Sequence, residues 1–263
     1  MNSKTSFNIG NIRIGGDASV VVQSMTNTDT NDVEASVAQC KRMIAAGAEM
    51  VRLTVPSLKE VEAMRQIRDR LRAEGILTPL VADVHFNPKV AEAMAAIVEK
   101  VRINPGNYVD KRNFSQRDVS DSEYAAAVER MALRAAPLFK ICKEYGTTIR
   151  LGINHGSLCD RIVTRYGNTP NAMVQSALEW IDICEKYDFH NKIIYFGTTA
   201  ASLFDIKTTP VAKVYPGVEV QATYVNNLLD NNFILKIDKN ITLILAIVLA
   251  IITGIMVLNV PST

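Results

Sequence analysis

A chain of 263 residues has room for one large domain or two small ones, and its 48% hydrophobic content supports a sizeable core. The formal net charge of +2 gives no electrostatic reason to expect a nucleic-acid partner. Residues 1–17 are polar and rich in glycine, so we expect no secretory signal there.

Apolar runs alternate with helical periods up to about residue 196. The apolar runs predict strands at residues 19–25, 50–54, 80–82, 101–103, 148–152 and 192–196. Capping residues, prolines and glycines bound the predicted helices, which lie at residues 32–46, 57–74, from 88 onward, 122–145 and 169–187. The polar stretch at residues 106–121 predicts an extended loop.

This alternation predicts parallel strands joined by right-handed crossovers, in either a doubly wound sheet or a (β/α)₈ barrel. A dinucleotide-binding sheet is disfavoured, because no G-x-G-x-x-G motif follows the first strand. Polar residues at the C-terminal ends of several strands favour the barrel, whose active sites are built there. We therefore predict an α/β fold, an incomplete TIM-type barrel of five βα units and a sixth strand, with its domain at residues 1–191.

Polar side chains stand at the C-terminal ends of the predicted strands, where a barrel would bring them to one mouth. They are Gln23, Arg52, Asp83, His85, Arg102, Asn104, Arg150 and Asn154. Arginine presents a planar fork of donors that matches phosphate oxygens, so three arginines suit a diphosphate or a small metabolite with two phosphates. Asp83 and His85 are the candidate catalytic pair, and Gly106 and Gly156 are expected to let backbone N–H groups approach the ligand.

A structural role is the alternative for each of these residues. A single arginine at a strand end is usually solvated or salt-bridged, and a single histidine is more often hydrogen-bonded than catalytic. Strand alternation turns Asp83 with His85, and Arg102 with Asn104, to one face. This shared face and the shared strand ends favour the site.

The cysteines predict free thiols rather than a metal site. They are Cys40, Cys142, Cys159 and Cys184, and no two of them have C-x-x-C spacing. Zinc and iron–sulfur sites commonly carry such local signatures. We therefore expect no metal ligands in this chain, and buried or partly buried thiols in a reducing compartment.

Long strings over residues 5–191 resemble one enzyme family. The strings are QSMTNTDTND (23–32), VRLTVPS (51–57), VADVHFNPKVA (81–91), VRINPGNYVDKR (101–112) and IRLGINHGSLCDRIVTRYGNTP (149–170). They resemble the hydroxymethylbutenyl diphosphate synthases, iron–sulfur oxidoreductases of the methylerythritol phosphate pathway of isoprenoid biosynthesis. The strings NHGSL and YDFHN (187–191) resemble the branch of that family with a long insertion.

The resemblance implies a cytoplasmic barrel that binds methylerythritol cyclodiphosphate, and a second domain whose 4Fe–4S cluster delivers two electrons and opens the ring. It also implies ferredoxin or flavodoxin as the electron donor, and a homodimer. Carried over by position, the residues implied to contact the diphosphate are Arg52, His85, Arg102 and Arg150. Those implied to hold the polyol part and neighbouring groups are Asp83, Asn104 and Asn154.

Part of the family's pattern is missing from these 263 residues. After YDFHN the family has a Met-Lys-Ala-Ser run whose lysine reaches the substrate, and here KIIYFGTTAAS stands in its place. A later glutamate strand and the cysteine-rich cluster domain are also missing, and none of the four cysteines matches the cluster ligands. We therefore expect the chain to retain part of the substrate site and to be inactive.

The last part of the chain has a different character. Residues 192–238 resemble the end of a CHASE type 2 sensor domain, an extracytoplasmic module. Residues 241–258 are uncharged and apolar, and at about 1.5 Å per residue they would span roughly 27 Å, as a transmembrane helix does. Lys236 and Lys239 precede them, so the positive-inside rule keeps the barrel in the cytoplasm, anchored to the inner membrane. The same rule puts the CHASE-like segment in the cytoplasm, although the module that it resembles is extracytoplasmic.

Three interpretations therefore stay open. The first is a truncated hydroxymethylbutenyl diphosphate synthase barrel without its redox centre. The second is a membrane-anchored chimeric binding or sensor protein that uses a degenerate barrel. The third is an artificial fusion of two sequences near Asn191–Lys192, without a biological role.

Overall fold

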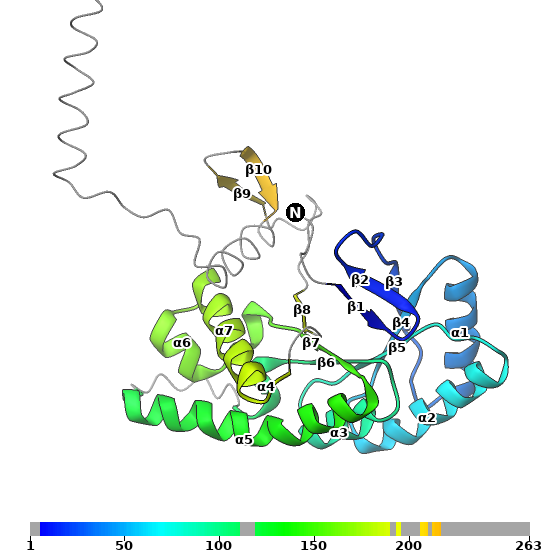
Figure 1. The fold of residues 1–263 in the computed structure, drawn as a ribbon, viewed down its shortest axis with the longest axis horizontal. Coiled ribbons are helices and arrows are strands. Elements are labelled where there is room, and N and C mark those ends of the chain that lie inside the picture. The colour runs from blue at the N-terminus through cyan, green and yellow to red at the C-terminus, as the bar shows by residue number, and fades with distance from the viewer. Residues whose placement is uncertain (1–5, 111–118, 190–192, 196–205, 210–211, 217–263) are drawn as a thin grey trace, which may run out of the picture. The chain divides into compact units, whose positions relative to one another are not determined.

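The computed structural model describes residues 6–110, 119–189, 193–195, 206–209 and 212–216 (Figure 1). The chain divides into two compact units, Met1–Gln221 and Ala222–Thr263. All of the described residues belong to the first unit.

A sheet of six parallel strands forms the centre of this unit. In spatial order the strands are β3 (Gln23–Met25), β4 (Met50–Thr54), β5 (Leu80–Asp83), β6 (Lys100–Ile103), β7 (Thr148–Leu151) and β8 (Ile193–Tyr195). Neighbours in sequence are neighbours in space, without the reversal of strand order that defines a doubly wound sheet. The α/β fold with a parallel sheet is consistent with a TIM-barrel domain, and the predicted alternation of strands and helices is confirmed.

Helices follow the strands and cover the outer side of the sheet. They are α1 (Val33–Ala45), α2 (Leu58–Ala73), α3 (Pro88–Ala95), α4 (Pro105–Tyr108), α5 (Asp121–Tyr145), α6 (Asp160–Tyr166) and α7 (Pro170–Lys186), with a 3₁₀ turn, η1 (His155–Ser157), before α6. Helix α1 packs on α2, α2 on α3 and α3 on α5, so these helices form a continuous row (Figure 1). The side chains of Asp32, Ser57 and Thr169 cap α1, α2 and α7 at the predicted starts.

Two local predictions were wrong. The first strand of the sheet begins only at Gln23 rather than at residue 19, and Val20 before it is 93% exposed. The stretch from residue 106, predicted as an extended loop, instead begins inside α4. Asn104 caps this short helix and Pro105 occupies its first position, which suits a residue without a backbone N–H. Residues 111–118 of the same stretch lie outside the described part of the chain.

The two faces of the sheet differ in composition. Outward side chains pack with the helices in one large hydrophobic core, and they are Val51, Leu53, Leu80, Ala82, Val101, Ile103, Ile149 and Leu151. The alternate, inward positions carry buried or half-buried polar side chains, namely Arg52, Asp83, Lys100, Arg102, Thr148 and Arg150. Because branched apolar residues usually fill the inside of a barrel, this polar inner face marks the place of a site.

An N-terminal hairpin that the sequence analysis missed covers the other end of the inner face. Its antiparallel strands are β1 (Ser6–Ile9) and β2 (Ile12–Gly15). The turn between them uses Gly10 at a φ of 57°, a conformation that favours glycine. Ile9 is fully buried and packs with Met50 and Val81, inward residues near the starts of β4 and β5. The hairpin therefore seals the N-terminal end of the inner face with apolar contacts.

Most of the C-terminal predictions lie outside the described residues. Strands β9 (Ile206–Thr209) and β10 (Ala212–Pro216) pair antiparallel and fall within the predicted sensor fragment, residues 192–238. The rest of that fragment, apart from β8, and the predicted transmembrane helix at 241–258 are not among the described residues. Within the described ranges, no helix has the length and apolar composition needed to cross a membrane.

Replacing Ile9 with alanine should destabilise the protein, because the buried side chain packs against Met50 and Val81. We expect Ile9→Ala to lower the free energy of unfolding by about 2–5 kcal/mol in urea titrations of the full chain. The control, Asn11→Ala in the exposed hairpin turn, should change it by less than about 0.5 kcal/mol. Equal effects of the two substitutions would show that the hairpin does not seal the inner face.

Candidate functional site

Four charged side chains meet on the inner face near the C-terminal ends of adjacent strands. Arg52 lies on β4, Asp83 on β5, Arg102 on β6 and Arg150 on β7. The strand register places Asp83 opposite Arg102, and Arg102 opposite Arg150. The structure therefore brings together the charged strand residues that the sequence predicted.

The carboxylate of Asp83 is the centre of this cluster. Its side chain is 2% exposed and forms ion pairs with Arg52 Nη2 and, at 3.2 Å, with Arg102 Nη1. His85 Nε2 lies 3.1 Å from Asp83 Oδ2, and His85 Nδ1 lies 3.1 Å from Arg102 Nη1. Because a guanidinium only donates, His85 Nδ1 accepts from Arg102, and Nε2 carries the proton that faces Asp83.

The environment keeps Asp83 ionised. Burial alone would raise the pKa of this carboxyl, but the hydrogen bond from His85 and the charges of Arg52 and Arg102 outweigh it and hold the pKa well below its usual range. A carboxylate with three donors and a low pKa is a poor proton acceptor near neutral pH. The geometry instead lets Asp83 orient the two arginines and the histidine.

Positive charge exceeds negative charge in this cluster. Within the described residues of this cluster, the guanidinium groups of Arg52, Arg102 and Arg150 outnumber the carboxylate of Asp83 by three to one. Burial, followed by the charges of Arg52 and Arg102, lowers the pKa of Arg150 to about 10. The Nε atoms of Arg52 and Arg102 are buried and find no hydrogen-bond partner in the described part of the chain. Unrelieved charge of this kind is costly, so the arrangement favours binding of an anion.

A buried arginine elsewhere in the fold shows how a structural cation is balanced. Arg161 on α6 is 7% exposed and pairs with Asp110 Oδ2 at 3.2 Å and with Glu179 Oε1 at 2.7 Å. Burial would lower the pKa of Arg161, but the hydrogen bond and charge of Glu179 raise it above its ordinary value. Two carboxylates therefore balance this one arginine, whereas three arginines share Asp83 on the inner face.

Gly152 makes room for one of the arginines. A Cβ atom at this position would lie 1.9 Å from Arg102 Nε, so any other residue would displace the guanidinium. Arg102 Nη2 also donates a 2.9 Å hydrogen bond to the Gly152 carbonyl. Gly152 was not among the predicted site residues, although it directly follows a predicted strand residue, Leu151, at the end of β7.

The two predicted asparagines hold the loops at the rim. Asn104 Oδ1 accepts a 3.1 Å hydrogen bond from Gly106 N, and Asn154 Oδ1 accepts one of 2.9 Å from Gly156 N. Asn104 Nδ2 also donates to Ser157 Oγ at 2.8 Å, which ties the loop after β6 to the loop after β7. The prediction that the glycine N–H groups face a ligand is therefore wrong, because the asparagine side chains occupy them.

The inner face also carries Lys100, which was not among the predicted site residues. Lys100 is 5% exposed, lies two residues before Arg102 on β6, and donates a 2.7 Å hydrogen bond to Gln23 Oε1 on β3. Burial, followed by the charges of Arg150 and Arg52, lowers the pKa of Lys100 to about 7. The alternation of Lys100, Val101 and Arg102 was the signal that placed this lysine on the arginine face.

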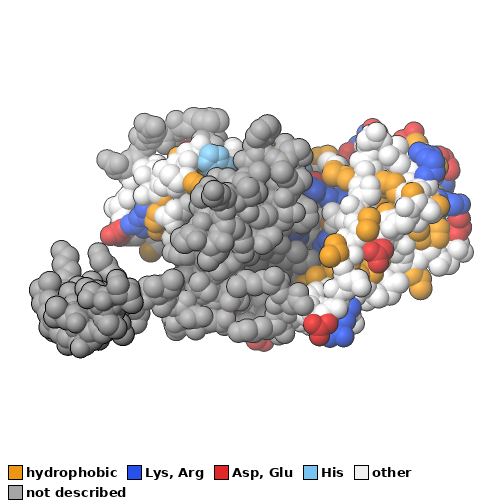
Figure 2. Space-filling view, turned by 90° about the horizontal axis from the view of Figure 1, so that it is seen from above, with side chains coloured by type: hydrophobic (Ala, Val, Ile, Leu, Met, Phe, Trp, Pro, Cys, Tyr) orange, Lys and Arg blue, Asp and Glu red, His pale blue; other side chains and the backbone are white. Residues whose placement is uncertain are grey.

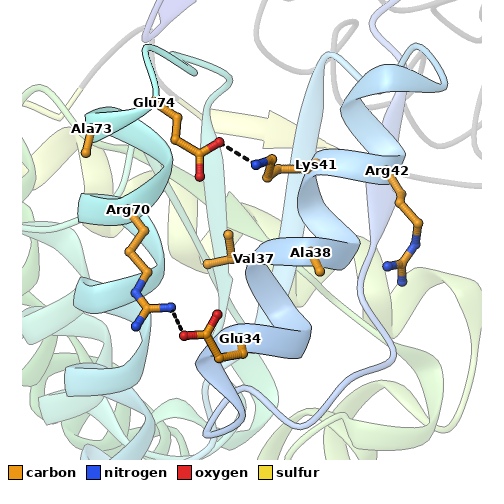
Figure 3. Close-up of a pocket in the computed structure, with 8 residues that line it drawn as sticks. All are labelled: Glu34, Val37, Ala38, Lys41, Arg42, Arg70, Ala73 and Glu74. Atoms are coloured by element: carbon orange, nitrogen blue, oxygen red, sulfur yellow. Dashed lines mark hydrogen bonds and ion pairs between the residues drawn. The ribbon is translucent and has the colours of Figure 1, made fainter.

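The outer surface offers a less suitable site. On the face shown in Figure 2, Lys and Arg side chains lie among Asp, Glu and hydrophobic side chains. A groove of about 610 Å³ lies between α1 and α2 (Figure 3). Four of its five charged residues pair across the groove, Lys41 with Glu74 and Arg70 with Glu34. None of the predicted site residues lines the groove.

The cysteines do not form a cluster site. Cys40, Cys142, Cys159 and Cys184 are buried and form no disulfide in the described part of the chain, which confirms the predicted buried thiols. Burial raises the pKa of Cys40 to about 11 and that of Cys184 to about 12, so the thiolates that ligate iron are disfavoured. Among the residues that the structure describes, no group of His, Cys, Asp and Glu could hold a metal ion. These side chains do not fit a 4Fe–4S cluster.

Removing the central carboxylate should unbalance the cluster. We expect Asp83→Asn to lower the free energy of unfolding by about 3–5 kcal/mol near neutral pH, because two buried arginines lose their counter-ion. The depressed pKa of Asp83 means that this contribution is present above about pH 4 and is lost as the pH falls further. In urea titrations at several pH values, the free energy of unfolding of Asp83→Asn should therefore fall less on acidification than that of the unchanged protein. Asp69→Asn, on the exposed side of α2, is the control and should keep the acid dependence of the unchanged protein. An equally reduced acid dependence in this control would contradict the assignment.

Filling the space at Gly152 should weaken anion binding. We expect Gly152→Ala to raise the Kd for inorganic pyrophosphate about 10-fold or more in calorimetric titrations, because Arg102 must move. Gly156→Ala is the matched control, since a Cβ there would meet only Asn154 Oδ1 at 3.5 Å. Equal affinities of the two variants would show that Arg102 does not contact the anion.

Comparison with known proteins identifies the family. The model of the GcpE TIM-barrel domain matches residues 4–206, beyond the predicted domain end at residue 191. Three bacterial relatives are each named 4-hydroxy-3-methylbut-2-en-1-yl diphosphate synthase (flavodoxin). The Bacteroides fragilis protein is 52% identical over 191 residues, 72% of this chain and 30% of the relative. The Parabacteroides distasonis protein is 51% identical and the Chlamydia muridarum protein 49%, each over 187 residues, 71% of this chain and 31% of the relative.

The chain therefore spans about 30% of the length of these relatives. Among solved structures, the phospho-2-dehydro-3-deoxyheptonate aldolase of Thermotoga maritima is 14% identical, with a TM-score of 0.42 over 75% of this chain and 48% of that one. The extent of the family match and the relatives' identity lead to one conclusion: the chain belongs to the GcpE family, through its TIM-barrel domain.

Proposed function

We propose that this chain supplies the substrate-binding barrel of a 4-hydroxy-3-methylbut-2-en-1-yl diphosphate synthase, and that it binds methylerythritol cyclodiphosphate in isoprenoid biosynthesis. The observation that carries the proposal is the gathering of three arginines around the buried carboxylate of Asp83, which gives the described part of this cluster more positive than negative charge. A cyclic diphosphate carries two negative charges, which match that surplus.

Each site residue has a proposed role in this binding. Arg52, Arg102 and Arg150 would contact the diphosphate, since planar guanidinium groups match phosphate oxygens. His85, whose side chain is 35% exposed, would contact the same ligand from the rim. Asp83 is proposed as a positioning residue rather than a proton acceptor, because it is already engaged by three donors.

The rim asparagines complete the proposed site. Asn104 and Asn154 each cap a loop that follows a strand, through their side-chain oxygens. Asn104 also links the two loops by its hydrogen bond to Ser157. We propose that they hold these loops in place beside the polyol part of the ligand.

The redox step is proposed to need a further component. The family resemblance implies a two-electron reduction through a 4Fe–4S cluster, supplied by flavodoxin or ferredoxin. The buried cysteines described above do not fit such a cluster. We therefore propose that these 263 residues bind the substrate and do not reduce it unaided. Product formed by the purified chain with a chemical reductant alone would contradict this.

The other predictions from the sequence remain proposals of lower rank. A barrel domain at residues 1–191, a cytoplasmic location and a homodimer stay proposals that rest on the sequence and on what the family resemblance implies. The membrane-anchored sensor rests on residues 192–238 and 241–258, of which the structure describes only β8, β9 and β10. The arginine cluster favours the substrate-binding barrel over the sensor.

The binding of the cyclic diphosphate tests the proposal directly. We expect Arg150→Met to raise the Kd for methylerythritol cyclodiphosphate about 10- to 100-fold in calorimetric titrations of the full chain, because one charge-assisted contact is lost. Arg70→Met, in the groove between α1 and α2, is the matched control and should bind like the unchanged protein. Failure of the unchanged protein to bind the ligand would refute the proposed function.

A further inference from the structure

A second layer of polar side chains lies beneath the arginines. Lys100 and Arg102 both point inward from β6, with Lys100 nearer the N-terminal end of the strand. The strand register places Lys100 opposite Val81 on β5 and Thr148 on β7. Lys100 therefore lies on the N-terminal side of Arg102, between the proposed diphosphate site and the end of the inner face that Ile9, Met50 and Val81 seal.

In the part of the chain that the structure describes, the surroundings of Lys100 supply no negative charge. From β3 it meets the neutral side chain of Gln23, at 2.7 Å, and from β4 and β7 the positive charges of Arg52 and Arg150. The positions opposite it, Val81 and Thr148, are uncharged. Within the described ranges, no carboxylate lies within ion-pair distance of Lys100, in contrast to the two that balance Arg161.

A buried amine among cations favours its neutral form. Burial and the charges of Arg150 and Arg52 lower the pKa of Lys100 to about 7, so a large share of the amines carries no charge near neutral pH. A diphosphate bound to the arginines would bring two negative charges into this space. The same amine would then favour the charged form, and binding would draw a proton from solvent.

We propose that Lys100 is a fourth cation of the anion site, which takes up a proton when a diphosphate binds to the arginines above it. This inference rests on the proposed function of the arginine cluster. In this proposal Lys100 stabilises the bound diphosphate electrostatically and takes no part in the opening of the ligand's ring. Gln23 fixes the direction of the amine in both protonation states, since its side-chain oxygen accepts from either.

The count of protons taken up on binding tests the inference. Methylerythritol cyclodiphosphate is the probe, because its phosphate groups have no ionisation near neutral pH. Calorimetric titrations at about pH 8, in two buffers of different ionisation enthalpy, should show uptake of about half a proton or more by the unchanged chain. Its Kd should rise with pH above about 7, by up to about 10-fold per pH unit, whereas Lys100→Met should show neither effect.

Variants and a ligand-free measurement separate the possible outcomes. Lys59→Met, on the exposed side of α2, should behave like the unchanged chain, and Lys100→Gln is a second variant that keeps a polar contact to Gln23. Without ligand, the stability of the unchanged chain should rise with pH from about 7 towards 10.5, because the unfolded lysine still holds its proton there. Both Lys100 variants should lack this rise.

Each contrary result has a distinct meaning. If the unchanged chain does not bind the probe, the proposed function and this inference both fail. If it binds, and the Lys100 variants show the same proton count and the same pH dependence, this inference alone fails. A ligand-free stability that depends on pH equally in all proteins would also overturn it, since Lys100 would then be charged before binding.

Discussion

The inner face of the sheet depends on one buried carboxylate. Asp83 pairs with Arg52 and Arg102 and lies 3.1 Å from His85, so it joins β4, β5 and β6 at the level of the site. Without that carboxylate, the guanidinium groups would repel one another in a space from which water is largely excluded. The cost of burying them is offset elsewhere, by the apolar outer face packed on the helices and by the seal at Ile9.

The excess of positive charge on the inner face is the feature of this structure that favours the binding of an anion. Where the fold needs a buried cation only for packing, it supplies two carboxylates, as it does for Arg161. On the inner face it supplies one for three arginines and leaves Lys100 without any among the described residues. A doubly negative ligand would restore the balance. The groove between α1 and α2 suits such a ligand less well, because two of its three basic residues are already paired with carboxylates.

The fold and most of the site could be predicted from the sequence, because buried parallel strands appear as apolar runs and Arg52, Arg102 and Arg150 interrupt those runs near their ends. Lys100 was not predicted as a site residue, because it follows Glu99 and resembles a solvated lysine at the edge of a strand. The caps formed by Asn104 and Asn154 depend on how two loops meet, through Ser157, which strand periodicity does not encode. The hairpin from Ser6 to Gly15 is short, and its contact of Ile9 with Met50 and Val81 joins residues far apart in the sequence, which local patterns do not encode.

The most direct test of the account is a crystal structure of the chain with methylerythritol cyclodiphosphate. We expect phosphate oxygens about 3 Å from Arg52 Nε and Arg102 Nε, the buried donors that lack partners in the described residues. We also expect the ion pairs from these arginines to Asp83 to be retained. Ligand bound in the groove between α1 and α2, with the arginine cluster unchanged and empty of phosphate, would contradict the central claim.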